Sequence, residues 1–210
     1  MSQHIHHHFW RLDIAREALD LGARRSVIQR MTGISEIELR RVFGQCPALT
    51  ANRGGRPRSV EKIFQVRQIH LHASDFYNTF HHLLQRGVPP AESMVVSYRL
   101  YQRRHSGDVR LDFDRAFSLV TSACRLWTTD EPSLKSIRCR QCGAQCLAPI
   151  GAIATDETPC TYCRAASRLK RLVAVEPRGE RQPQGQQRAI HFQPVAHVSP
   201  GTPIGLRPPL

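Results

Sequence analysis

The chain has 210 residues, of which 30 are Lys or Arg and 17 are Asp or Glu, so its formal net charge is +13 at pH 7. A charge this far from zero attracts polyanions, and nucleic acid is the favoured partner over an anionic membrane or an acidic protein. The sequence has no run of about 18 uncharged apolar residues, which a membrane-spanning helix would need. It also does not open with a basic segment followed by an apolar stretch, as a secretion signal would. We therefore expect a cytoplasmic protein.

The N-terminal region has apolar residues at helical spacing and predicts three helices. The first covers about 9–21 and the second about 23–31, and the third begins after Ser35, which can cap it. A turn that contains Gly33 separates the second helix from the third. Two short helices joined by such a turn are the helix-turn-helix pattern, which we place at about 23–45. An ordinary helical hairpin is an equally good interpretation of the turn alone.

Three longer helical stretches follow, at about 60–86, 91–104 and 112–128. In the last of them, aromatic and apolar side chains fall on one stripe. This stripe indicates a buried core face, with a partner interface as the alternative. Its residues are Phe113, Phe117, Val120, Cys124 and Trp127.

Two Cys-x-x-Cys pairs predict a metal site in the second half of the chain. Cys139 and Cys142 form the first pair, Cys160 and Cys163 form the second, and seventeen residues lie between the pairs. This spacing is typical of a four-cysteine zinc site, in which two tight turns each direct two thiolates at one ion. Four protein ligands leave no open position for water. We therefore predict one structural Zn²⁺ per chain.

Other interpretations of the cysteines fit less well. Cys146 lies four residues after Cys142 and could replace one ligand, but the two matched pairs already satisfy the ion. Four buried free thiols at this spacing would be a coincidence. Iron–sulfur clusters use other common spacings, and a thioredoxin-like site needs a strand before a single pair. We interpret Cys146 as a residue outside the metal site.

Basic side chains gather in three places and are the candidate DNA contacts. One group lies on the third predicted helix, the second in a Gly-rich and Pro-rich arm that cannot form a core, and the third directly after the last cysteine. A solvated helix face is the alternative interpretation of the third group. The predicted contacts are Arg40, Arg41, Arg53, Arg56, Arg58, Arg164, Arg168, Lys170 and Arg171.

The expected architecture is mainly α-helical. We expect a helical domain at 1–131, a four-cysteine zinc-binding region with a basic extension at 132–175, and a tail at 176–210. Pro, Gly, Gln and Arg dominate the tail, and this composition predicts disorder.

Three stretches of the sequence together resemble the FlhC family of bacterial flagellar transcriptional activators, over about residues 12–172. The first is Leu21-Gly22-Ala23-Arg24, and the second is His72-Ala73-Ser74 with Phe76, Asn78 and Leu83-Leu84. The third is Tyr98-Arg99-Leu100-Tyr101, then Arg115-Ala116-Phe117 with Leu119-Val120, before the paired cysteines. The arm at 53–58 departs from the family pattern because it is more basic and richer in Gly.

The resemblance implies a mostly helical protein with zinc on Cys139, Cys142, Cys160 and Cys163. It also implies a hetero-oligomer of two FlhC-like and four FlhD-like chains. That complex would bind double-stranded promoter DNA ahead of flagellar operons, recruit RNA polymerase and so activate the genes for flagellum biogenesis.

Two other classes of function remain as alternatives, and an enzyme is not expected. The sequence has no Gly-rich phosphate loop, no paired carboxylates on one element and no His-Glu metal motif. A zinc-containing RNA-binding module would share the charge and the cysteine pairs, but it should show aromatic stacking platforms, and aromatic residues are only 7% of the chain. A protein-interaction module for an acidic partner is the other alternative.

Overall fold

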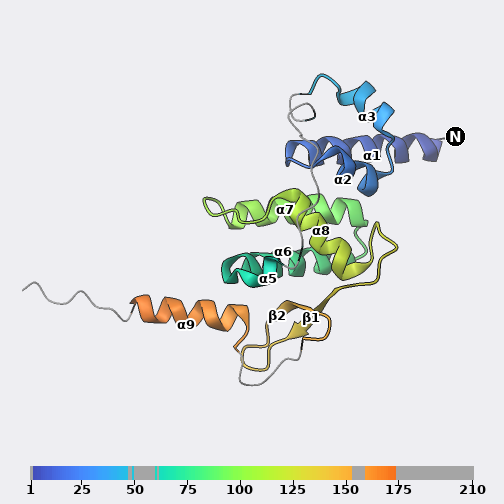
Figure 1. Ribbon diagram of the computed structural model, residues 1–210. Coiled ribbons are helices and arrows are strands. Elements are labelled where there is room, and N and C mark those ends of the chain that lie inside the picture. Colours follow the sequence, from blue (N-terminus) through green and yellow to red (C-terminus); the bar gives the residue numbers. More distant parts are fainter. Residues whose placement is uncertain (1, 47–48, 50–59, 61, 153–158, 174–210) are drawn as a thin grey trace, which may run out of the picture. The chain divides into compact units, whose positions relative to one another are not determined.

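Helices make up most of the computed structural model, and one small hairpin of two strands follows α8 along the chain (Figure 1). The model describes residues 2–46, 49, 60, 62–152 and 159–173, which belong to one compact unit. The helices are α1 (Ser2–Asp20), α2 (Arg25–Thr32), α3 (Glu36–Phe43), α5 (Lys62–Gln65), α6 (Arg67–Gln85), α7 (Pro90–Arg104), α8 (Phe113–Cys124) and α9 (Thr161–Val173). The strands are β1 (Leu134–Arg138) and β2 (Gln145–Pro149). Across these residues, no helix is long and apolar enough to cross a membrane.

The first three helices contain the helix-turn-helix-like segment that the sequence predicts. α2 packs against both α1 and α3, and it buries Ile28 completely. It ends at Gly33, whose left-handed backbone with a φ of 69° suits a residue without a β-carbon. Ser35 then caps α3, because its hydroxyl oxygen accepts a hydrogen bond from the Glu38 N–H at 3.2 Å. α1 begins at Ser2, earlier than the apolar periodicity indicates.

The aromatic core lies between α6, α7 and α8. Phe76 of α6 meets Tyr98 of α7 edge to face, with ring centroids 6.2 Å apart. Tyr98 makes the same kind of contact with Phe113 of α8 at 5.1 Å. All three side chains are buried, so the predicted apolar stripe of α8 begins inside the core.

Two more of the predicted helices differ in extent from the structure. α8 ends at Cys124 because Arg125 adopts a left-handed conformation with a φ of 56°. Trp127 therefore lies beyond the helix, but it still stacks on Phe117 with ring centroids 5.0 Å apart. The predicted stretch at 60–86 is divided into α5 and α6, because Val66 has an extended backbone conformation.

The hairpin of β1 and β2 was not predicted, and it carries the cysteines between and after its strands. The two strands are antiparallel, with Leu134 opposite Pro149 and Arg138 opposite Gln145. β2 buries three consecutive residues and packs on α6. Strands of five residues with so little alternation are weak signals in a sequence, which is why the periodicity did not show them.

One face of α6 holds β2 by hydrogen bonds to its backbone. His70, Ser74 and Asn78 are spaced four residues apart and so lie along one side of the helix. His70 Nε2 donates to the Leu147 carbonyl at 2.7 Å, and Ser74 Oγ accepts from the Leu147 N–H at 3.2 Å. Asn78 donates to the Gln145 carbonyl at 2.9 Å. These bonds fix the position of the cysteine-bearing hairpin relative to the helical core.

Candidate metal centre and basic cavity

The four paired cysteines come from two separate elements and meet at one point. Cys139 directly follows β1, and Cys142 lies in the turn between the strands. Cys160 directly precedes α9, and Cys163 lies in the first turn of that helix. Their four sulfur atoms all lie within 4.8 Å of one another. The hairpin and α9 therefore offer two thiols each to a common centre.

The sulfur positions are close to those of a tetrahedral zinc site. A Zn–S distance of about 2.3 Å in a regular tetrahedron places neighbouring sulfurs about 3.8 Å apart. The sulfurs of Cys139 and Cys163 are 3.9 Å apart, and those of Cys142 and Cys160 are 3.5 Å apart. The cluster can thus hold a zinc ion with little movement of the chain.

Local backbone geometry directs the sulfurs of each pair. In the first turn the Gly143 N–H donates to the Cys139 carbonyl at 2.9 Å, and Gly143 has a φ of 73° that disfavours a side chain. In the second pair the Cys163 N–H donates to the Cys160 sulfur at 3.4 Å. An N–H directed at a sulfur stabilises the thiolate that a metal requires.

The thiols of the cluster differ in acidity. The pKa of Cys139 is lowered to about 6, first because the backbone N–H of Cys142 donates a hydrogen bond to its sulfur. The pKa of Cys163 is raised to about 12, first because of its hydrogen bond with the Cys142 side chain. One thiolate is therefore favoured at neutral pH, and a bound divalent cation would favour deprotonation of the others.

Cys146 is close in sequence but does not belong to this group of four sulfurs. It lies on β2, where its side chain is buried. Burial, followed by the neighbouring thiols, raises the pKa of Cys146 to about 12. A buried neutral thiol is a small apolar side chain and a poor metal ligand.

A cavity of about 1050 Å³ lies beside the cysteine cluster. Its walls come from α5, α6, the hairpin and α9, so it exists only because these elements pack together. In the described part of the chain its charged lining is strongly basic, with five arginines and a single carboxylate. These residues are Arg67, Asp108, Arg138, Arg140, Arg164 and Arg168.

The structure places the predicted DNA contacts on two different helices. Arg40 and Arg41 are exposed on α3, and Arg40 donates to Glu36 at 2.7 Å. Arg164, Arg168 and Lys170 are exposed on α9, and the two arginines line the cavity. Arg171 also belongs to α9, but its side chain lies outside the described residues, as do Arg53, Arg56 and Arg58.

Reasoning from the sequence missed three of the cavity arginines. Arg67 opens α6, Arg138 ends β1, and Arg140 lies in the turn between the strands. Arg138 and Arg140 lie on either side of Cys139, but Arg67 lies far earlier in the chain, so only the tertiary structure brings it to the other two. No sequence signal could have selected Arg67, whereas Arg138 and Arg140 could have been noticed as neighbours of a predicted metal ligand.

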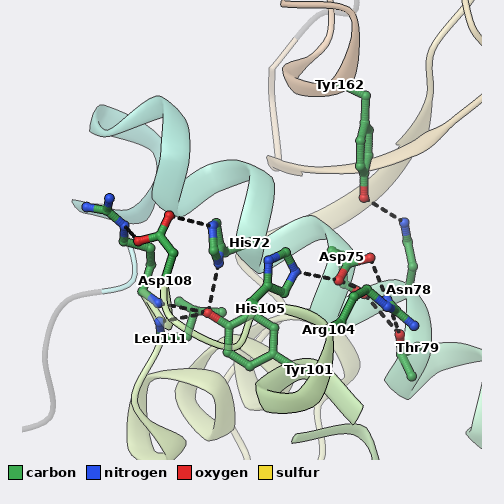
Figure 2. A network of polar contacts seen from close by, with 11 residues as sticks. His72, Asp75, Asn78, Thr79, Tyr101, Arg104, His105, Asp108, Leu111 and Tyr162 are labelled. Atoms are coloured by element: carbon green, nitrogen blue, oxygen red, sulfur yellow. Dashed lines mark hydrogen bonds and ion pairs between the residues drawn. The ribbon is translucent and has the colours of Figure 1, made fainter. Parts of the chain in front are cut away.

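A second polar site that the sequence did not reveal centres on Tyr101 of α7 (Figure 2). The Tyr101 hydroxyl lies 2.9 Å from His72 Nδ1 and accepts a hydrogen bond from the Leu111 N–H at 3.0 Å. The ring of His72 stacks obliquely on that of His105 at 4.2 Å, and His105 Nε2 lies 2.9 Å from a carboxylate oxygen of Asp75. This network joins α6, α7 and the segment before α8.

Comparison with known proteins gives one consistent family. The sequence profile of the flagellar transcriptional activator (FlhC) family matches residues 2–175. The chain is 32% identical over 181 residues to the flagellar transcriptional regulator FlhC of Paraburkholderia atlantica, covering 81% of this chain and 78% of that protein. It is 29% identical over 195 residues to the protein of the same name from Cupriavidus metallidurans, covering 89% and 87%. For that of Sodalis glossinidius the identity is 29% over 168 residues, covering 75% and 79%.

Proposed function

The chain belongs to the FlhC family of flagellar transcriptional regulators, and we propose that it performs this regulation by binding promoter DNA together with an FlhD-like partner. This family consists of transcriptional regulators and not of enzymes. A function on DNA places the protein in the cytoplasm. The observation that carries the proposal is the basic helix α9, which begins at the cysteine cluster and presents its arginines beside a basic cavity.

A structural zinc ion, one per chain, completes the proposed site. Cys139 and Cys142 would hold it from the hairpin, and Cys160 and Cys163 from the start of α9. The support is the convergence of four sulfurs within 4.8 Å, which supplies all four ligands that a tetrahedral ion needs. Such an ion would tie α9 to the hairpin and limit the motion of the basic side chains that follow. Ordered side chains lose less entropy when they bind a phosphate.

Contacts to the DNA backbone are assigned to α9. Arg164, Arg168 and Lys170 are exposed on this helix, and Arg171 follows in its last turn. Phosphate contacts of this kind supply affinity but cannot distinguish one sequence from another.

Sequence discrimination is assigned to α3 and to the arm that follows it. Arg40 and Arg41 are exposed on α3, the second helix of the helix-turn-helix-like segment. Arg53, Arg56 and Arg58 of the arm would enter a minor groove. Arg40 would exchange its ion pair with Glu36 for a contact with DNA.

The partner is assigned to the apolar surface of the first helices. Phe9 of α1 and Ile37 of α3 have exposed fractions of 60% and 82%, and a contact between His8 and Glu38 brings these two helices together. Large apolar side chains exposed side by side mark a protein interface more often than a DNA interface. By family resemblance the assembly would contain two chains of this kind with four FlhD-like chains, and it would recruit RNA polymerase to the promoter.

The test is a binding measurement on the complex co-purified with its FlhD-like partner. Fluorescence anisotropy should show tighter binding to a flagellar promoter duplex than to a random duplex, with log K falling linearly against log salt. The double substitution Arg168→Ala with Lys170→Ala should make that slope shallower by about two units, since each phosphate contact contributes about 0.9. The matched control is Arg86→Ala with Arg103→Ala, which removes the same charge from two exposed positions, one directly after α6 and one on α7.

Three outcomes would count against the proposal. Equal slopes for the two double variants would remove α9 from the DNA contact. A wild-type complex that binds neither duplex would refute DNA binding altogether. Stronger competition by single-stranded RNA than by duplex DNA would favour an RNA-binding module instead.

A further inference from the structure

The cavity beside the cysteine cluster has the charge of an anion-binding site. Among the residues that the structure describes, five arginines and only one acidic residue, Asp108, line it. Asp108 already pairs with Arg110, which partly neutralises it. A zinc ion on four thiolates would add a charge of about −2 nearby, and the lining would still be positive. An anion that enters from solvent therefore meets a favourable potential.

Two of the cavity arginines are held in place by the backbone. Arg138 Nε donates to the Gly143 carbonyl at 3.2 Å, and Arg164 Nε donates to the Pro159 carbonyl at 2.6 Å. Each bond uses one N–H of the guanidinium and leaves its terminal nitrogens to donate elsewhere. A guanidinium that is oriented in advance loses less entropy when it binds a phosphate in the bidentate manner.

Within the described residues, four of the five cavity arginines have no carboxylate partner that would compete with a ligand. Among the residues that the structure describes, Arg67, Arg138, Arg164 and Arg168 form no ion pair. Several other arginines of the fold do pair with acids, as Arg24 does with Asp114 at 2.7 Å. Positive charge that is left unpaired in a concave surface costs stability through mutual repulsion unless an anion binds there.

The spacing of the basic residues on α9 indicates several phosphates in a row. Arg164 and Arg168 both line the cavity, and their spacing of four residues puts them on one face of the helix. Four residues of α-helix extend about 6 Å, and one DNA strand presents a phosphate every 3.4 Å or so along the duplex axis. A duplex backbone can thus place phosphates against both arginines along this face of α9, whereas a small phosphorylated molecule would occupy the cavity alone.

We propose that the mouth of this cavity is a phosphate-binding site for duplex DNA, in which Arg138 and Arg164 bind backbone phosphates with support from Arg67 and Arg168. The inference rests on the proposed function, and it adds Arg67 and Arg138, which belong to α6 and β1, to the contacts on α9. The DNA surface then extends from α9 across the hairpin to the start of α6.

The experiment measures promoter-duplex affinity of the co-purified complex as a function of salt. Arg138→Lys and Arg164→Lys keep the charge but lose the fixed guanidinium, so each should weaken binding about tenfold. Arg103→Lys is the matched control on α7 and should change nothing. The side chain of Arg67 forms no hydrogen bond with the described residues near the cysteines, so its removal should leave the cluster intact. Arg67→Ala should make the salt slope shallower by about 0.9. Zinc content and circular dichroism of each variant show that the fold is kept.

The outcomes separate this inference from the proposed function. If the wild-type complex binds the promoter duplex but Arg138→Lys, Arg164→Lys and Arg67→Ala all match it, the cavity is not a DNA contact and only the inference fails. If the wild-type complex binds no duplex, the proposed function fails. A direct titration with pyrophosphate in the absence of DNA tests whether the cavity binds a small phosphorylated ligand instead. Pyrophosphate binding that Arg138→Lys abolishes, together with unchanged DNA slopes, would assign the cavity to a small phosphorylated ligand and overturn the inference.

Discussion

Replacing Tyr101 with Phe removes one oxygen atom on which three other groups of the core depend. The hydroxyl accepts hydrogen bonds from the N–H groups of Arg110 and Leu111, both at 3.0 Å. A hydroxyl oxygen accepts two such bonds and donates one. Its own proton must therefore go to His72 Nδ1 at 2.9 Å (Figure 2). His72 is in consequence a neutral imidazole that carries its proton on Nε2.

The cost of Tyr101→Phe follows from the groups left without partners. The Leu111 N–H and His72 Nδ1 are buried, and each buried polar group without a partner costs about 1–3 kcal/mol. The Arg110 N–H belongs to an exposed residue and can find water. We expect the free energy of unfolding to fall by about 2–6 kcal/mol, which is a large part of the 5–15 kcal/mol that is usual for a domain.

The same geometry makes stability depend on pH. The pKa of His72 is lowered, first by burial and then by the nearby charge of His105, while Asp108 and Asp75 act in the opposite direction. Because the unfolded chain binds the proton more readily, the contribution of neutral His72 is present above about pH 6.5 and is lost as the pH falls below it. A protonated imidazole would have to donate at Nδ1 to an oxygen that already accepts two bonds.

The assay is urea unfolding of the wild-type chain and of Tyr101→Phe, both without the partner, at pH 7.5 and pH 5.5. Tyr98→Phe is the control. Tyr98 is a buried tyrosine of the same helix, and its hydroxyl donates to the Leu111 carbonyl at 2.8 Å. We expect Tyr98→Phe to cost about 1–3 kcal/mol, because it leaves one buried group, the Leu111 carbonyl, without its partner. Nitrogen-15 spectra of the histidine rings should show the Nε2–H form of His72 at pH 7.5. A Tyr101→Phe cost no larger than that of Tyr98→Phe, or an Nδ1–H signal for His72, would refute the reasoning.

Two further predictions concern the metal and the partner. Cys139→Ala should release zinc and leave a protease-sensitive chain, whereas Cys146→Ala should keep its full zinc content. Elemental analysis measures the zinc in both variants. Loss of zinc from Cys146→Ala would mean that the ligand set is wrong. Ile37→Asp should reduce co-purification with the FlhD-like partner at least tenfold, because it replaces an apolar side chain that is 82% exposed with a charged one. Arg40→Ala should reduce promoter discrimination and leave the partner bound. If Arg40→Ala released the partner and Ile37→Asp reduced only promoter discrimination, Arg40 would be the partner contact and Ile37 the DNA contact.

Features that depend on neighbouring residues could be predicted from the sequence. Gly33 and Ser35 mark the end of one helix and the start of the next because capping and left-handed backbone are local properties. The two Cys-x-x-Cys pairs were visible for the same reason, since each pair is built by a single turn. Helical spacing of apolar residues was enough to predict a mainly helical fold.

Tertiary structure alone decided how these local units are arranged. The β1–β2 hairpin is held by His70, Ser74 and Asn78 of a helix far from it in the chain, and its own short strands carry too little pattern to be recognised. Arg67 and Arg138 meet at one cavity only after α6, the hairpin and α9 have packed together. Contacts between distant segments depend on the shape and burial of whole elements, which no window of neighbouring residues contains. The chemistry of the cysteines was therefore readable in the sequence, whereas the basic cavity beside them was not.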